Sequence, residues 1–140
     1  MKKTSFYLYQ LIILCFYIAG FVYLTRQSFM PYHSEILGLP WPQLDASLQV
    51  LILAGIHGFG GFLVCIASAL MFLLYIPFKT QQFWAKIAVA LITFLTLAVL
   101  IGVVVSVKIQ TAAHPPFIPL LVLLFFWAVA TVLSFTQSVK

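Results

Sequence analysis

The chain has 140 residues, of which 64% are hydrophobic and only 6% are charged, and its formal net charge is +5. About a quarter of the residues of a soluble domain are charged, and a domain of this length leaves much of its surface exposed, so the composition excludes a water-soluble fold. The positive charge does not indicate a nucleic-acid partner, because the basic residues form no stripe that could follow a phosphate backbone.

Four long apolar runs separated by three polar breaks make up most of the sequence. The predicted membrane spans are residues 6–25, 48–75, 87–107 and 118–135. A helix needs about 20 mainly apolar residues to cross a bilayer. Helices are expected because backbone polar groups in lipid must be satisfied within the protein, and the runs lack the alternating polarity of a β-barrel. The sequence therefore predicts one all-α domain, residues 1–140, in contact with the lipid bilayer.

The ends of the predicted spans have recognisable signals. The first span is followed by Arg26-Gln27 without a small-residue cleavage pattern, so we interpret it as a retained helix rather than a signal peptide. The first break holds Pro31, Pro40 and Pro42 and predicts one short helical turn at 34–37 along the membrane surface. Pro77 is expected to stop the second span.

Basic residues predict the orientation. With short breaks the four helices should form an antiparallel up-down-up-down bundle, which places both termini on one side. That side would carry Lys2, Lys3, Lys79, Lys86 and Lys140. The other side would carry Arg26 and Lys108 together with both acids of the chain. By the positive-inside rule, both termini should lie in the cytoplasm.

The second span contains a run of small residues. Ala54, Gly58, Gly61, Cys65 and Ala69 recur at spacings of three and four and should share one helical face. Such a face lets another helix approach closely in lipid. The partner could be another helix of the same chain, a second copy or another subunit, or the face could form a groove for a lipid tail.

His57 is the one histidine expected well inside a span. Ionisable groups at membrane depth are candidates for function. No second histidine lies inside a span to complete a bis-histidine haem or a histidine-only metal site, so we expect neither cofactor nor metal. We favour a structural hydrogen bond, with a ligand or proton role as the alternative. The partners considered are Thr93, Thr96, Thr131 and Ser134.

Polar groups gather in the first and third breaks, on the side opposite the termini. The residues are Tyr32, His33, Glu35, Trp41, Asp45 and His114. We interpret them as an interfacial cap, with tyrosine and tryptophan at the headgroups. The weaker alternative is a divalent metal site around His33-x-Glu35.

Short segments across the chain carry a resemblance. They are Met30-Pro31-Tyr32-His33, Gly60-Gly61, Ile76-Pro77-Phe78-Lys79 and Ala113-His114-Pro115-Pro116. With these the chain resembles a group of small uncharacterised bacterial four-helix membrane proteins. The resemblance implies a multi-pass protein of the bacterial inner membrane and no particular activity.

Three functional hypotheses follow. The first is a non-enzymatic accessory subunit or scaffold that acts by helix association, with the glycine face of the second span in a homo-oligomer or larger complex. The second is a binder or carrier of a small apolar molecule, a lipid or quinone, in a pocket near His57. The third, a membrane enzyme using His57, ranks last, because no acid lies within a span.

Overall fold

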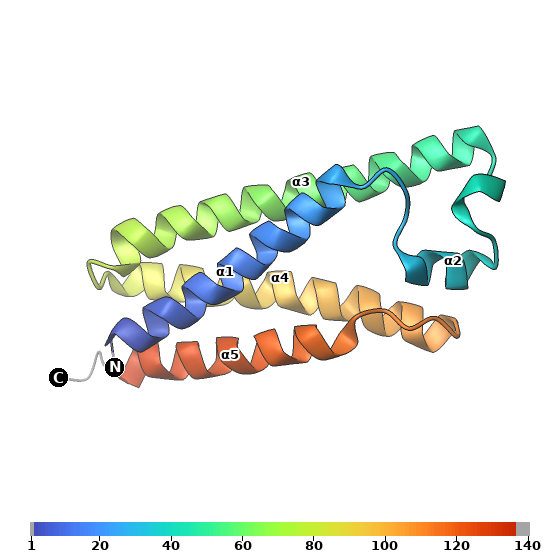
Figure 1. Ribbon diagram of the computed structural model, residues 1–140. Coiled ribbons are helices and arrows are strands. Elements are labelled where there is room, and N and C mark those ends of the chain that lie inside the picture. The colour runs from blue at the N-terminus through green and yellow to red at the C-terminus, as the bar shows by residue number, and fades with distance from the viewer. Residues whose placement is uncertain (1, 137–140) are drawn as a thin grey trace.

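The computed structural model describes residues 2–136 and folds them into a helical bundle. The long helices are α1 (Lys2–Thr25), α3 (Ala46–Leu73), α4 (Phe83–Gln110) and α5 (Phe117–Thr136). The short elements are α2 (Pro31–Leu37), η1 (Trp41–Gln43) and the π turn η2 (Leu74–Phe78). Figure 1 shows the long helices side by side, with the start of α1 and the end of α5 at the same end of the bundle. The predicted all-α four-helix bundle is confirmed; Lys140, used above to predict orientation, lies outside the described residues.

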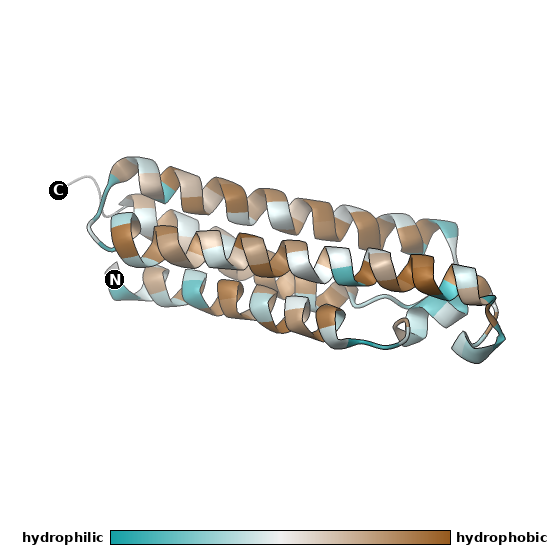
Figure 2. Cartoon of the chain, turned by 90° about the horizontal axis from the view of Figure 1, so that it is seen from above, coloured by the Kyte–Doolittle hydropathy of each residue, from teal (hydrophilic) through white to brown (hydrophobic). Residues whose placement is uncertain are grey.

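The outer surface of the bundle is apolar. Each of the four long helices, with η2 continuing α3, is long and apolar enough to cross a membrane. Large hydrophobic side chains such as Ile18, Phe62 and Phe125 are exposed on these helices. Hydrophilic residues concentrate towards the two ends (Figure 2). Water would not solvate such a surface, so the protein is a multi-pass membrane protein in contact with lipid.

The helices extend beyond the predicted spans at several points. α4 begins at Phe83, so Lys86, which was expected in the break, lies in its first turns and is buried. Pro77 does not simply stop the second span, because the chain continues through the π turn η2, where Lys79 N–H donates to Leu74 O at 3.2 Å. The wider turn accommodates a proline that lacks an N–H.

α1 has the most extensive packing of the four long helices. It packs along α3 and α5, while α4 packs mainly along α5 and only slightly against α3. The main core includes Tyr9, Ile12, Leu70 and Phe78 and is concentrated towards the end of the bundle at which α1 begins. The opposite end is therefore held by fewer large buried side chains.

Two glycines lie where the backbones of α1 and α3 approach each other closely. A Cβ atom added at Gly60 would lie 2.7 Å from the carbonyl oxygen of Gly20, and one added at Gly20 would lie 2.9 Å from that of Gly60. Small residues at a crossing of membrane helices allow this proximity. The contact was not predicted, because Gly20 is isolated within an aromatic span.

Hydrogen bonds between side chains and neighbouring helices reinforce the packing. The Tyr9 hydroxyl lies 2.8 Å from Thr131 Oγ1 and joins α1 to α5. Trp127 Nε1 donates to Ala90 O at 2.8 Å and joins α5 to α4. Tyr17 donates to Ser68 Oγ at 2.9 Å and joins α1 to α3.

Candidate functional site

A large open cavity lies between the helices in the half of the bundle away from the termini. Its volume is about 900 Å³, and all four long helices contribute to its wall, together with His33 from α2 and Pro116 from the loop before α5. α3 and α4 have little mutual contact, and part of the space between the four helices is not filled by side chains.

Each wall of the cavity is one face of a helix. α1 contributes Leu11, Cys15, Ala19 and Tyr23, which are spaced four residues apart and therefore share a side of the helix. The remaining wall comes from Gly55, Ile56, Phe59 and Leu63 of α3, Leu100, Val103 and Val104 of α4, and Ile118, Pro119, Leu120, Val122, Leu123 and Phe126 of α5. Small residues on the α1 and α3 faces help to leave the volume open. At Gly55, no atom lies within 4 Å of an added Cβ.

The wall is almost entirely apolar. Among its side chains, polar hydrogen-bonding groups come from Tyr23 and His33, and Cys15 adds a thiol. The Tyr23 hydroxyl is already paired with the Tyr32 hydroxyl at 3.0 Å. The carboxyl groups of Glu35 and Asp45 do not line it. The cavity thus suits an apolar molecule with at most a small polar end.

His33 is held rigidly at the cavity by the start of α2. The ring Nδ1 accepts a hydrogen bond from the backbone N–H of Met30 at 3.2 Å, and the backbone N–H of His33 donates to Met30 O at 2.9 Å. The ring also stands edge to face with Tyr32, at 4.2 Å between centroids. Burial lowers the pKa of His33. The neutral form, with Nδ1 accepting, therefore carries its proton on Nε2, which bonds to none of the described residues.

His57 does not line this cavity. Its Nε2 lies 2.7 Å from the carbonyl oxygen of Arg26, and because a carbonyl only accepts, Nε2 donates. The hydrogen bond ties α3 to the end of α1, where helix carbonyls lack partners in the chain. A structural bond is therefore present, but the threonine and serine partners named from the sequence are wrong. Thr96 donates to Ile92 O within α4, and buried Thr93 Oγ1 has no partner among the described residues.

The small-residue face of α3 points away from the bundle. Gly58 and Cys65 are exposed, and no atom lies within 4 Å of a Cβ added at Gly58. Gly61 is only half-buried, with Leu24 Cδ2 at 3.9 Å. The helix uses Gly60, one position away from the predicted stripe, for its contact inside the chain.

The polar residues of the first and third breaks lie in separate groups rather than in one cluster. Glu35 of α2 accepts a hydrogen bond from His114 N–H at 2.8 Å and lies 3.5 Å from His114 Nδ1, which fastens α2 to the loop before α5. Trp41 packs edge to face on Phe29, with 5.1 Å between the ring centroids.

Asp45 lies apart from these residues as the N-cap of α3, and hydrogen bonds from the hydroxyl and backbone N–H of Ser47 lower its pKa. Burial raises the pKa of Tyr32. Within residues 2–136, no three metal-binding side chains come together.

A smaller recess adjoins the cavity. It has a volume of about 260 Å³, lies between α3 and α4, and shares Phe59, Leu63 and Leu100 with the larger space. The loose contact of α3 with α4 thus leaves an apolar space on both sides of these three residues.

Comparison with protein-family models, with curated proteins and with solved structures finds no match to this chain. The class that the fold defines is a multi-pass four-helix membrane protein, and its function must be argued from its own geometry.

Proposed function

We propose that this protein binds an amphiphilic lipid, holding the apolar chain of the lipid in the cavity between α1, α3, α4 and α5. The observation that carries the proposal is the cavity of about 900 Å³ with its apolar wall. Ligand sites in proteins typically have volumes of about 300–1,000 Å³ and a few fixed polar groups, and helical bundles often build them between their helices.

The polar end of the lipid would lie at His33. The Nε2–H of the neutral ring is a donor at the cavity wall, so it suits a carbonyl or ester oxygen. A quinone ring or an acyl ester would supply that acceptor. The capping bond to Met30 and the packing on Tyr32 hold the donor in place before the lipid arrives, which reduces the entropy lost on binding.

The recess between α3 and α4 gives the chain of the lipid a route from the bilayer. Phe59, Leu63 and Leu100 separate this recess from the cavity, and rotation of these side chains would join the two spaces. Apart from Thr96 the recess is lined by apolar side chains, so the chain of the lipid would stay in apolar surroundings during such lateral entry.

Lipid analysis of matched glycine variants tests the proposal. Gly55→Phe places a ring in the cavity, whereas Gly58→Phe places the same ring on the outer face of the same helix, and neither glycine has an atom within 4 Å of its Cβ position. Mass spectrometry of the purified wild-type protein should detect a stoichiometric lipid. The Gly55→Phe variant should lose most of this lipid, and the Gly58→Phe variant should retain it. Equal lipid content in all three proteins would refute the proposal.

A second candidate function is helix association through the outward face of α3. We propose it because Ala54, Gly58, Cys65 and Ala69 are exposed and are not used by the fold itself. A second copy of the chain could approach this face closely. Gly58→Leu is a cleaner probe than Gly61→Leu, because Gly61 already approaches Leu24. Size determination in detergent should give a dimer for wild type and a monomer for Gly58→Leu, and a monomeric wild type would remove this candidate.

We further propose a bacterial inner-membrane location with the start of α1 and the end of α5 in the cytoplasm. Lys79 lies between η2 and α4, at the same end as Lys3, and supports this orientation by the positive-inside rule. Both acids belong to the opposite end, Glu35 in α2 and Asp45 at the start of α3.

A further inference from the structure

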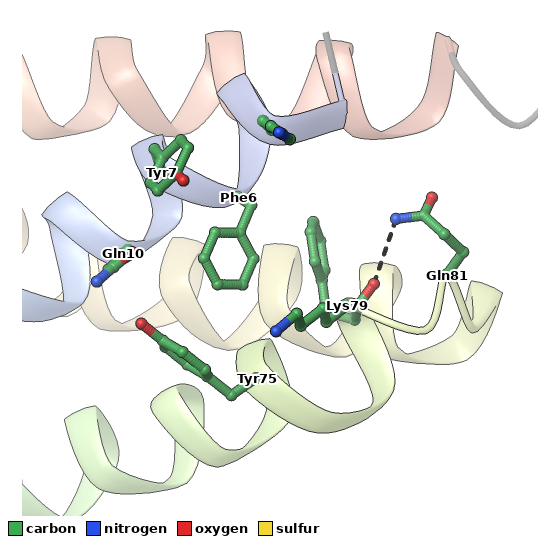
Figure 3. A pocket seen from close by; sticks show the side chains of 8 residues that line it. Phe6, Tyr7, Gln10, Tyr75, Lys79 and Gln81 are labelled. Carbon is green, nitrogen blue, oxygen red and sulfur yellow. Dashed lines mark hydrogen bonds between the residues drawn. The ribbon is translucent and has the colours of Figure 1, made fainter.

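A second recess opens at the end of the bundle where α1 begins and α3 ends. Its volume is about 500 Å³ (Figure 3). Four of its residues come from α1 and four from η2 and the turn after it: Lys3, Phe6, Tyr7, Gln10, Tyr75, Phe78, Lys79 and Gln81. It shares no residue with the cavity proposed above for the apolar chain, and the inference does not depend on that function.

The recess is positively charged. Lys3 and Lys79 line it, and no acid does. The two acids of the chain are committed at the far end, where Glu35 binds His114 and Asp45 caps α3. No described ion pair includes either lysine. Residues 2–136 therefore supply two ammonium groups here and no carboxyl group to balance them.

The other groups in the recess divide into polar tips and apolar rings. The hydroxyl of Tyr75 and the amide of Gln10 are hydrogen-bond donors. The rings of Phe6 and Tyr75 stand edge to face at 5.2 Å, and Lys79 extends into the space that they border (Figure 3). A ligand with an anionic head and an apolar body would contact both kinds of group, the head at the polar tips and the body at the rings.

The local backbone is built to present this surface. The π turn places Tyr75, Phe78 and Lys79 around the recess, and Gln82 N–H closes a further wide turn on Pro77 O at 3.0 Å. Gln81 has a φ of 66°, in the left-handed region that residues other than glycine seldom adopt. Its side chain bonds back to Phe78 O at 3.4 Å. Such π turns and strained residues occur frequently at functional sites.

We propose that this recess binds the phosphate headgroup of an anionic membrane lipid in the leaflet next to the chain termini. The recess lies at the ends of two membrane-spanning helices, at the level where headgroups are found. Basic pockets between membrane helices bind such headgroups. The rings of Phe6 and Phe78 favour a lipid over a free phosphate ion, because they offer the glycerol and upper chain an apolar contact.

Thermal unfolding of the full chain in a neutral detergent tests this site, with tryptophan fluorescence as the signal. Phosphatidylglycerol should raise the unfolding midpoint, because a ligand that binds only the folded state stabilises it. Lys79→Gln and Lys3→Gln should each raise the half-saturating lipid concentration about fivefold, the effect expected from one lysine at a membrane surface. High salt should weaken the effect in wild type.

The matched control is Lys108→Gln, which removes the same charge at the other end of α4, where Lys108 Nζ lies 5.3 Å from the centre of the Phe117 ring. This variant should respond to phosphatidylglycerol as wild type does. Three outcomes would overturn the proposal. They are equal stabilisation by phosphatidylcholine, equal stabilisation by inorganic phosphate, and equal weakening by Lys108→Gln, which would indicate net charge alone.

Discussion

At the scale of single residues, neighbouring glycines of α3 have different roles. Gly60 faces α1 at the crossing with Gly20, where an added Cβ would meet the Gly20 carbonyl at 2.7 Å and the Leu24 nitrogen at 2.8 Å. Gly58 faces outward and Gly55 faces the cavity, each with no atom within 4 Å of an added Cβ. Helix packing, the outward surface and the cavity wall thus each involve a different glycine within two turns of one helix.

Gly60→Ala should destabilise the protein by about 1–3 kcal/mol, the usual effect of overpacking a close contact. The backbone atoms that a Cβ would meet cannot rotate away, so α1 and α3 must separate. Gly58→Ala is the matched control, because its added methyl group meets nothing. Unfolding midpoints in detergent measure both. Equal stability of the two variants would show that the Gly20–Gly60 approach is not as close as described.

His33 gives the outer cap a dependence on pH. An unfolded histidine titrates near 6.5, and burial lowers the pKa of His33 in the folded protein. The unfolded state therefore binds more protons in the window below 6.5, and stability falls as pH decreases through it. Protonation also removes the Nδ1 acceptor for Met30 N–H. The ring neighbours Phe29 and Tyr32 carry no charge in this range.

Lowering the pH from about 7.5 to about 5.5 should therefore lower the unfolding midpoint of wild type more than that of His33→Gln, which cannot titrate. Because His114 is a second histidine at this end of the bundle and lies against Glu35, the comparison is repeated in a His114→Ala background. An identical pH response with and without His33 would contradict this account of the cap.

At the scale of elements, side-chain hydrogen bonds hold the helices together where lipid gives no hydrophobic force. Thr131 Oγ1 donates to Trp127 O at 2.8 Å, so it accepts from the Tyr9 hydroxyl. The bond thus joins Tyr9, which is buried in the core of the bundle, to the half-buried Thr131 of α5. It lies near the hydrogen bond from Trp127 to Ala90 O, so one short stretch of α5 is hydrogen-bonded to both α1 and α4.

A double-mutant cycle of Tyr9→Phe and Thr131→Val should measure a coupling of about 0.6 kcal/mol and not more than about 1.7 kcal/mol, as for other hydrogen bonds between membrane helices. Tyr17→Phe, whose bond to Ser68 is exposed, gives a comparison on the other side of α1. Additive effects of the Tyr9 and Thr131 changes would mean that the two hydroxyls do not interact.

The sequence predicts elements better than it predicts their mutual placement. Apolar length and proline positions are local, so the four long helices and the short helix after Pro31 could be predicted. The partner of His57 could not, because it is the backbone carbonyl of Arg26, and every residue has a carbonyl. The rotation of α3 about its axis, which buries Gly60 rather than Gly61, depends on where α1 offers space beside Gly20. The cavity depends on how far the helix pairs diverge, and no single residue signals that distance.

At the scale of the whole molecule, the two ends of the bundle differ in charge and in packing. The end with Lys3 and Lys79 has the denser core and a basic recess. The other end has both acids, a cap fastened by Glu35 and His114, and the large apolar cavity. A lipid-binding site in each half would let the protein contact both leaflets at once.

Cysteine labelling tests the proposed orientation. In a chain with Cys15 and Cys65 replaced by serine, His114→Cys should react with a membrane-impermeant maleimide in intact cells, because this side chain is exposed beyond α4. Lys79→Cys, exposed at the opposite end, should react only after the membrane is opened. The reverse pattern would invert the orientation, and reaction of both in intact cells would contradict a spanning bundle.

Photo-crosslinking with a lipid that carries a diazirine in its acyl chain tests the cavity most directly. Adducts should map to residues such as Cys15, Ala19 and Val104, which line the cavity, and should disappear when excess unlabelled lipid competes. Outward residues such as Leu14 and Phe21 of α1, which do not line the cavity, should give adducts that do not saturate. If adducts form evenly around α1 and none can be competed away, lipid only surrounds this protein and does not occupy a site within it.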